Sequence, residues 1–318
     1  MEILLPFVAS FVLTVALMPL FIGYFNRKKI GQTTREEGPL WHEVKTGTPT
    51  MGGTVFMAAI LVTLLVSSWM MRLLNTNIWM ILLTFLLFGG IGFLDDFISI
   101  FKKQNEGLSS KQKFLAQLVF SAVILGIGYL SGAHFMIPIF SWQITAVILL
   151  LPFGIAWITG FSNAVNLTDG LDGLAGGLNI IAYSAYFALA YSANRLDVAL
   201  ACLIVVGALL GFLFYNKKPA KIFMGDVGSL ALGAGLAVIS LILNTPWSLL
   251  IIGLVFVIET ASVIIQVAVF KKTGKRVFKM SPIHHHFEMV GWSESKVVGV
   301  FWFVGIIAAI LYFTITSL

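Results

Sequence analysis

Long apolar runs separated by short polar breaks dominate the chain. Uncharged stretches cover residues 3–26, 46–71, 73–94, 114–168, 173–194, 198–216, 227–258 and 297–318. A helix needs about 20 apolar residues to cross a bilayer, so 114–168 must hold two helices. The stretch 227–270, in which Glu259 is the only charged residue, must also hold two. The pattern predicts about ten transmembrane helices, near residues 3–25, 51–71, 78–98, 114–131, 143–160, 174–192, 197–214, 228–244, 249–270 and 297–317.

Composition supports one all-α integral membrane domain over residues 1–318. The chain is 58% hydrophobic and only 11% charged, whereas soluble domains are about one quarter charged. This excludes an ordinary soluble enzyme and a disordered chain. The lone Cys202 lies in an apolar run, which excludes a disulfide framework and a thiolate metal site.

Basic residues are concentrated on one side of the predicted helices. The loops 26–50, 101–113, 215–226 and 271–296 hold 18 of the 20 Lys and Arg residues. Because cytoplasmic loops carry the excess of basic residues, these four loops are predicted to be cytoplasmic and both termini extracytoplasmic. The basic residues flank helices and form no stripe, so we expect no nucleic-acid partner.

Acidic residues gather on the same face. Five of the six Asp lie in predicted cytoplasmic loops or at cytoplasmic helix ends: Asp95, Asp96, Asp169, Asp172 and Asp226. For any single one of them, a helix cap or a solvated loop acid is the better explanation. Five together favour a site, because carboxylates at membrane depth are expensive and usually functional.

The adjacent pair Asp95–Asp96 indicates a cation. Neighbouring carboxylates repel and stay ionised together only beside positive charge, and hard oxygen ligands suit Mg²⁺. Asp169 and Asp172 lie in a turn, 166–173, and would share a face if that turn were helical. A plain helix start with acids in its first turn is the alternative there. Asp226 lies between Gly225 and Gly228, where glycine allows the backbone to approach a ligand closely, and it is predicted to open the next helix.

Hydroxyl, Gly, Lys and His residues complete this face. Residues 46–53 are rich in Gly and Thr and are expected to present N–H groups to phosphate. Lys45, Lys113 and Lys221 are candidate phosphate partners, although each alone is equally a topology signal. The run His284–His286 is poor geometry for a three-His zinc site and favours capture of an anionic group.

Two polar residues lie within the predicted helix 249–270. Glu259 and Gln266 are seven residues apart and therefore share one face. Lining a cavity and joining helices by hydrogen bonds are equally compatible with this spacing.

These features favour Mg²⁺-dependent transfer of a phosphoryl group from a soluble nucleotide-sugar to a lipid phosphate. The sequence lacks the Gly-x-x-x-x-Gly-Lys-Ser/Thr loop of one ATPase class. A proton-coupled carrier is disfavoured because Glu259 is the only acid at mid-bilayer depth.

The motifs resemble those of the polyprenyl-phosphate N-acetylhexosamine-1-phosphate transferase superfamily, and within it the phospho-N-acetylmuramoyl-pentapeptide transferase family. The resemblance covers essentially the whole chain. Its motifs are His42-x-x-Lys45-x-Gly-Thr-Pro-Thr-Met-Gly-Gly53, Gly92-Phe-Leu-Asp-Asp96, Asn166-Leu-Thr-Asp-Gly-Leu-Asp-Gly173, Phe223-Met-Gly-Asp226, Glu259 to Gln266 and Pro282-Ile-His-His-His286-Phe-Glu288.

The resemblance implies a reaction in which UDP-MurNAc-pentapeptide and undecaprenyl phosphate give lipid I and UMP, the first membrane step of peptidoglycan synthesis. It further implies dependence on Mg²⁺, ten helices with outward termini, a bacterial plasma (inner) membrane location and a homodimer.

The resemblance also implies roles for individual residues. The expected catalytic residues are Asp95, Asp96, Asp226 and His284, with Asp226 also the Mg²⁺ ligand and Asp95 the preferred base. The expected substrate-binding residues are Lys45, Thr50, Lys113, Asn166, Asp169, Asp172, Asn216, Phe223, Gln266, His285 and His286.

Several alternatives remain open at this point. The family often has Lys where this chain has Ser99, and its loop lysine corresponds to Lys111 or Lys113, with Lys113 preferred. A sister enzyme that transfers GlcNAc-1-phosphate is the nearest alternative, and a non-catalytic lipid-phosphate carrier is the alternative from another class. Direct attack and a covalent enzyme intermediate are both compatible with these motifs.

Overall fold

Helices account for nearly all of the chain that the computed structural model describes, which is residues 3–28, 31, 45–101, 107–139 and 142–316. His42 of the first motif lies outside the described residues. The helices are α1 (Leu4–Lys28), α2 (Gly53–Met70), α3 (Thr76–Phe101), α4 (Ser110–Leu130), α5 (Val147–Thr168), α6 (Leu174–Ser192), α7 (Leu196–Asn216), α8 (Asp226–Ile242), α9 (Ser248–Ile252), α10 (Leu254–Thr273), α11 (Ile283–Met289) and α12 (Glu294–Thr316).

The predicted fold class, an all-α integral membrane protein, is confirmed. Within the described residues, nine helices are long and apolar enough to cross a membrane. They match nine of the ten predicted ranges. The remaining range corresponds to α8, an apolar helix of 17 residues in which every residue from Val227 to Ile242 is buried.

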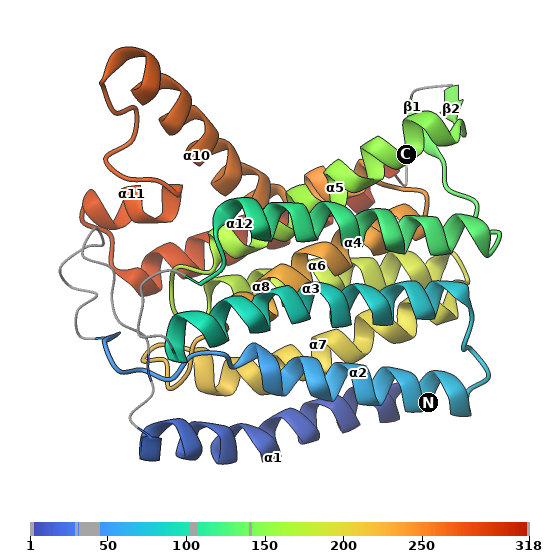
Figure 1. Ribbon diagram of the computed structural model, residues 1–318, viewed down its shortest axis with the longest axis horizontal. Helices are drawn as coiled ribbons and strands as arrows, with labels where there is room; N and C mark the ends of the chain where they lie inside the picture. Colours follow the sequence, from blue (N-terminus) through green and yellow to red (C-terminus); the bar gives the residue numbers. More distant parts are fainter. Residues whose placement is uncertain (1–2, 29–30, 32–44, 102–106, 140–141, 317–318) are drawn as a thin grey trace.

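The structure differs from the prediction at 249–270, where one helix was expected. The segment breaks at Gly253 into α9 and α10, and α10 leans away from the bundle (Figure 1). A Cβ added at Gly253 would lie 2.7 Å from the Leu249 carbonyl oxygen. Glycine is a usual site of helix kinks, and hydrophobicity alone carries no sign of the break.

A second difference lies in the loop before α5. Strands β1 (Ile137–Ile139) and β2 (Trp142–Ile144) form an antiparallel hairpin, with Ile137 opposite Ile144. The Trp247 indole N–H donates to the Pro138 carbonyl at 2.6 Å and ties the hairpin to the segment before α9. The predicted helix start at residue 143 is therefore wrong, because a short apolar strand and a helix share the same hydrophobicity.

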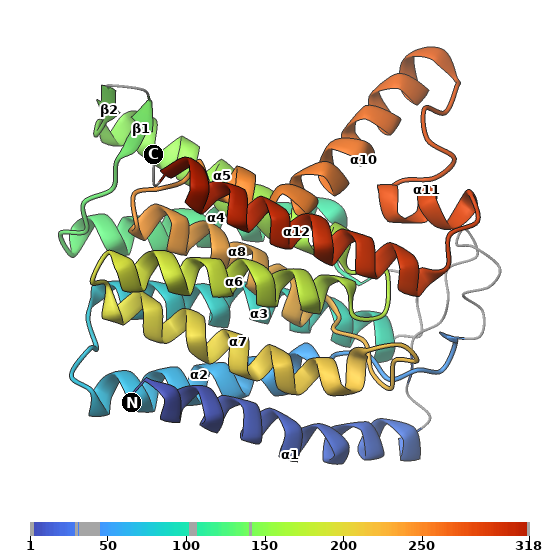
Figure 2. The same cartoon turned by 180° about the vertical axis from the view of Figure 1, so that it is seen from behind.

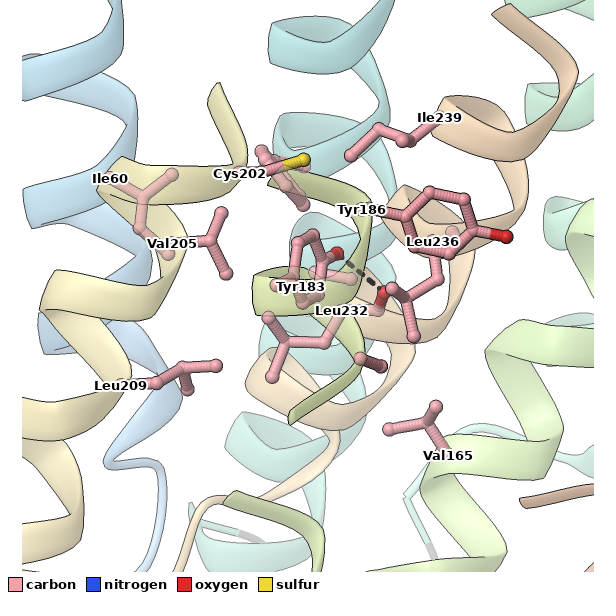
Figure 3. Close-up of a cluster of buried hydrophobic side chains, with 14 of the residues drawn as sticks. Ile60, Val165, Tyr183, Tyr186, Cys202, Val205, Leu209, Leu232, Leu236 and Ile239 are labelled. Atoms are coloured by element: carbon pink, nitrogen blue, oxygen red, sulfur yellow. Dashed lines mark hydrogen bonds between the residues drawn. The ribbon is translucent and has the colours of Figure 1, made fainter. Parts of the chain in front are cut away.

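The core lies where α6, α7 and α8 meet. Helix α8 packs against α3 and α5, and α7 packs against α1 and α6. Tyr183 of α6 is fully buried, and its hydroxyl donates to the Leu232 carbonyl of α8 at 2.8 Å (Figure 3). Cys202 is buried in the same cluster, as expected for a core residue.

Both chain ends lie at one end of the bundle, as an even number of crossings requires (Figures 1 and 2). Helix α11 and the breaks before α2, α6 and α8 lie at the opposite end, with the predicted site residues. The sidedness of these ends follows from the Lys and Arg distribution and stays a prediction.

Candidate active site

Three carboxylates from two helices meet at this end of the bundle. Asp95 and Asp96 lie near the end of α3, and Asp226 is the first residue of α8. The helices cross closely at Gly92, where an added Cβ would lie 2.2 Å from the Asp226 carbonyl group. One oxygen from each of the three carboxylates lies within 4.8 Å of the others. The predicted acid cluster therefore exists and is assembled by the α3–α8 crossing.

Lys113 bridges two of these carboxylates. Its Nζ lies 2.9 Å from Asp95 Oδ2 and 2.6 Å from Asp226 Oδ2. The Asn166 side-chain amide donates to Asp226 Oδ1 at 2.8 Å, so both Asp226 oxygens have partners. Lys111 is exposed on the first turn of α4, so the structure brings Lys113, the preferred candidate, to the acids.

Backbone groups orient the acid pair on α3. Asp95 Oδ1 accepts from the Leu108 N–H at 2.8 Å, and Asp96 Oδ2 accepts from the Val227 N–H at 3.3 Å. Gly225 has a φ of 74°, and a Cβ there would lie 2.4 Å from Asp96 Oδ2. Glycine is thus required beside the acids both by its backbone conformation and by the space available.

These residues fit a magnesium ion. The cluster offers carboxylate oxygens, the ligands that Mg²⁺ takes alongside substrate phosphates. The three acids converge from two helices, so an ion held by them would draw on one rigid crossing rather than on a loop. Lys113 already neutralises part of their charge and shares Asp226 Oδ2.

Asp169 lies at the end of α5, beside the start of α8. Burial, followed by the nearby Asp226 charge, raises the pKa of Asp169 to about 7. The turn after it is not helical, so Asp169 and Asp172 do not share a helical face. Asp169 approaches Asp226 and Gly225, whereas Asp172 joins a different group of charges.

This second group is centred on Lys45. Its Nζ lies 2.7 Å from Asp172 Oδ1 and 2.5 Å from Glu294 Oε1. Burial lowers the pKa of Lys45, but the hydrogen bonds and charges of Asp172 and Glu294 outweigh it and leave the pKa raised. Lys45 also lies 6.0 Å from the centre of the Phe223 ring. Lys221, by contrast, is exposed.

The backbone connects the two groups of charges. The Phe223 N–H donates to the Pro49 carbonyl at 2.8 Å, and the Gly52 N–H donates to the Phe223 carbonyl at 2.9 Å. Thr50 is buried within this pairing. Phe223 therefore stands beside Lys45, while Asp226, three residues later, belongs to the acid cluster.

Asn216, at the end of α7, fixes the same region. Its Oδ1 accepts from the Gly173 N–H at 3.1 Å, and its Nδ2 donates to the Ile222 carbonyl at 2.9 Å. The oxygen and the nitrogen of the side-chain amide are thus both bonded to backbone, so Asn216 shapes the turn 169–173 and the segment before Phe223.

The three histidines face different partners. His284 is fully buried, with Nδ1 3.1 Å from Glu259 Oε1, and its Nε2 would lie 2.3 Å from a Cβ at Gly170. His285 Nδ1 lies 2.9 Å from Glu288 Oε2. His286 Nδ1 accepts from the Lys279 N–H at 3.1 Å. The prediction that they do not converge on one metal is consistent with this geometry.

Gln266 is engaged with backbone rather than with open space. Its Oε1 accepts from the Val277 and Phe278 N–H groups at 2.9 Å, and its Nε2 donates to the Phe278 carbonyl at 2.9 Å. The structure shows neither alternative for Gln266 among the described residues: its side chain orders the loop between α10 and α11 and joins no second membrane helix.

Sequence reasoning missed Glu294 and Ser229. Glu294 joins Lys45 and Asp172, and the Ser229 hydroxyl accepts from Asn166 at 2.9 Å. The available signal for Glu294 was a single acid directly before an apolar helix, which also describes an ordinary helix start. Lys45 and Asp172 both lie more than 100 residues away from Glu294 in sequence, so no local pattern reveals these contacts.

Known proteins resemble this chain over nearly its whole length. Residues 78–244 match glycosyl transferase family 4. The phospho-N-acetylmuramoyl-pentapeptide-transferase of Lactobacillus gasseri is 53% identical over 314 residues, 98% of this chain and 98% of its own. The proteins of the same name in Lactiplantibacillus plantarum and Listeria monocytogenes are 54% and 49% identical, each over 96% of this chain and 95% of their own.

Proposed function

We propose a reaction for this protein on the strength of its family: the chain belongs to the phospho-N-acetylmuramoyl-pentapeptide transferase family. It is a multi-pass bacterial inner-membrane enzyme that transfers phospho-MurNAc-pentapeptide from UDP-MurNAc-pentapeptide to undecaprenyl phosphate, giving lipid I and UMP. The observation that carries the proposal concerns one short segment, residues 223–226. Its Phe223 lies beside Lys45, and its Asp226 belongs to the carboxylate cluster, so the segment connects the two groups of charges.

The chemistry exchanges one phosphoanhydride bond for another. An oxygen of the lipid phosphate forms a bond to the sugar-linked phosphorus of the donor, and the bond from that phosphorus to the UMP oxygen breaks. A phosphate monoester has a second pKa of about 6, so any remaining proton must leave the acceptor. We propose that Asp95 is the base that accepts this proton, and that Asp96 is the second member of the catalytic pair.

Charge neutralisation and positioning supply most of the catalysis in phosphoryl transfer. Asp226, with Asp95 and Asp96, would hold Mg²⁺, which neutralises phosphate charge when bound. Lys113 places a cation at the same point. Asn166 orients Asp226, so we infer that it serves the site through this carboxylate.

We assign the nucleotide of the donor to the region around Lys45 and Phe223. Phe223 offers an aromatic face there, and Asp172 contacts Lys45. Asn216 binds the backbone of the turn 169–173 and of Ile222, and Asp169 lies near Gly225, so we assign these three residues to the same region. Thr50, His285 and His286 remain candidate substrate contacts at the edges of this region. The burial of His284 against Glu259 and Gly170 favours a role in the architecture of the site.

We assign the isoprenoid chain of the acceptor to a groove between α4 and α5. The groove has a volume of about 460 Å³, and its lining is mostly apolar. Phe114 directly follows Lys113, and Asn163 lies one turn before Asn166, so the groove continues from the carboxylate cluster. A lipid phosphate bound at Lys113 would leave its chain in this groove. The lining residues are Phe114, Leu118, Pro152, Ile155, Ala156, Thr159, Gly160 and Asn163.

The test is a reconstituted transfer assay on the purified protein. With Mg²⁺, undecaprenyl phosphate and UDP-MurNAc-pentapeptide, we expect equal amounts of UMP and lipid I. Transfer from UDP-GlcNAc alone would establish the sister activity instead. Lipid movement across vesicles without UMP release would establish a carrier.

The groove has its own variants. Ala156→Trp fills it and is expected to raise the KM for the lipid acceptor while leaving the KM for the donor unchanged. Leu149→Trp, on the exposed outward part of α5, is the matched control. An equal effect of both substitutions would remove the groove from the proposal.

The homodimer is also proposed from the family alone, and mass measurement in detergent tests it.

A further inference from the structure

Glu294, the first residue of α12, is buried and has a partner at each oxygen. Oε1 lies 2.5 Å from Lys45 Nζ and accepts from the Asp172 N–H at 2.9 Å. Oε2 lies 3.0 Å from the Nζ of a second lysine, Lys218. One side chain therefore contacts three separate segments of the chain.

These contacts form a closed network with Asp172. Asp172 Oδ1 lies 2.7 Å from Lys45, and its Oδ2 accepts from the Ala220 N–H at 3.0 Å. The network contains two carboxylates and two ammonium groups, so its formal charges balance. It joins the segment before α2, the turn 169–173, the loop after α7 and the start of α12.

The position of Lys45 in this network leaves room for a ligand. An ammonium group has three N–H donors, and two of them face Asp172 and Glu294. Its side chain remains 21% exposed, and it lies beside the Phe223 ring. Among the residues that the structure describes, the third donor has no partner, so it is available at the nucleotide region, and the two carboxylates fix its direction.

We propose that Glu294 is a positioning residue for donor recognition. It acts through Lys45 and the turn 169–173, holding both in the arrangement that receives the nucleotide of the donor, and it does not contact the acceptor lipid. This inference rests on the proposed function, because it assigns the nucleotide to the region around Lys45.

The alternative effect of Glu294 would be competition, in which its carboxylate occupies Lys45 and weakens donor binding. The contacts favour positioning, because Glu294 also holds the Asp172 N–H and Lys218. Competition requires only the Lys45 contact. Removing one partner of a buried charged hydrogen bond leaves the other unsatisfied, so loss of the carboxylate would loosen three segments together.

The experiment compares Glu294→Gln with wild type in the transfer assay. The donor KM is expected to rise about ten-fold or more, with the affinity for UMP falling by a similar factor. The acceptor KM is expected to stay within about two-fold and kcat within about three-fold. A lower donor KM would establish competition, and equal changes in both KM values would indicate general disruption. Either result overturns the proposal.

Asp197→Asn is the matched control. Asp197 is also a buried carboxylate that accepts from two side-chain amides, Asn75 at 2.9 Å and Asn77 at 2.8 Å. It lies at the start of α7, at the other end of the bundle. This variant is expected to lose thermal stability while keeping the donor KM, which separates loss of a buried acid from loss of positioning.

A double variant tests whether Glu294 acts through Lys45. In the Lys45→Met background, Glu294→Gln is expected to lower kcat/KM by less than about three-fold further, because coupled residues are not additive. A fully multiplicative loss would contradict the proposal. If Glu294→Gln does not fold, Glu294→Asp keeps the charge on a shorter side chain and is expected to raise the donor KM selectively. Absence of transfer by wild type would instead reject the proposed function.

Discussion

At the acid cluster, Asp226 is the residue on which the most contacts converge. Lys113 contacts one of its oxygens and Asn166 the other, while its backbone lies against Gly92 of α3. A divalent cation at Asp226 must share an oxygen with Lys113 or with Asn166, or displace one of them. Metal affinity and lysine position are therefore linked at this carboxylate.

Asp226→Asn is expected to lower Mg²⁺-dependent turnover by about 100-fold or more, because it removes a negatively charged ligand from the cluster. Turnover against Mg²⁺ concentration and Mn²⁺ binding by electron paramagnetic resonance measure the two effects separately. Asp197→Asn, remote from the cluster, should keep both the Mg²⁺-dependent turnover and the Mn²⁺ binding of wild type. Near-wild-type turnover in Asp226→Asn would remove Asp226 from the metal site.

Asp169 makes stability depend on pH. Its folded pKa of about 7 lies above its usual value of 3.8, so the folded state binds this proton more tightly than the unfolded state. The stabilising contribution of Asp169 to folding is fully present below about pH 4 and is lost as pH rises through 7.

Asp169→Asn removes this titration. The melting temperature of the variant minus that of wild type is the quantity to compare, and we expect this difference to be larger at pH 8 than at pH 5. Thermal unfolding at both pH values in one detergent measures the difference. The same offset at the two pH values would show that Asp169 titrates alike in the folded and unfolded states.

At the scale of elements, the crossing of α3 and α8 sets the geometry of the site. Both acids of α3 and Asp226 of α8 are carried to one place by the close approach at Gly92. Displacing one helix by the width of a methyl group moves the carboxylates apart, although no substrate contact has changed.

Gly92→Ala is expected to lower stability by about 1–3 kcal/mol, as overpacking typically does, and to lower kcat as well. Gly90→Ala is the control on the same helix, since a Cβ at Gly90 has no heavy atom within 4 Å. Thermal unfolding and the transfer assay on both variants provide the comparison. If Gly90→Ala is impaired as strongly, helix crossing is not the cause.

Hydrophobic length predicted the elements well but not their breaks. The ten ranges all correspond to helices, because membrane crossing requires long apolar runs. The hairpin before α5 depends on a contact of Pro138 with Trp247, 109 residues away in sequence, which no local pattern contains. The break at Gly253 lies in an apolar run, so hydrophobic length does not reveal it.

The same division holds for the site. Asp95, Asp96 and Asp226 could be predicted because charge is rare in this chain. Gln266 was expected to line a cavity or to join helices, whereas it binds the backbone of the loop after α10. Glu294 was missed because all three of its partners lie far from it in sequence.

At the scale of the whole molecule, the basic residues define two sides. The predicted sides are tested with a membrane-impermeant maleimide on single cysteines. The natural Cys202 is fully buried and provides an unlabelled background.

Gln143→Cys, in the exposed hairpin, is expected to be labelled in intact cells. Lys275→Cys, exposed after α10, is expected to be labelled only after permeabilisation, because basic loops stay in the cytoplasm. Wild type should remain unlabelled in both conditions. The reverse pattern would invert the topology.

Helix α8 has a consequence for resistance to inhibitors. Every residue from Val227 to Ile242 is packed against other helices, so nearly any substitution along it disturbs the core. Exposed faces of α1 and α10 tolerate exchange among apolar residues far more readily. An inhibitor that depends on Asp226 and the first turn of α8 would therefore leave the bacterium few escape mutations compatible with a folded enzyme.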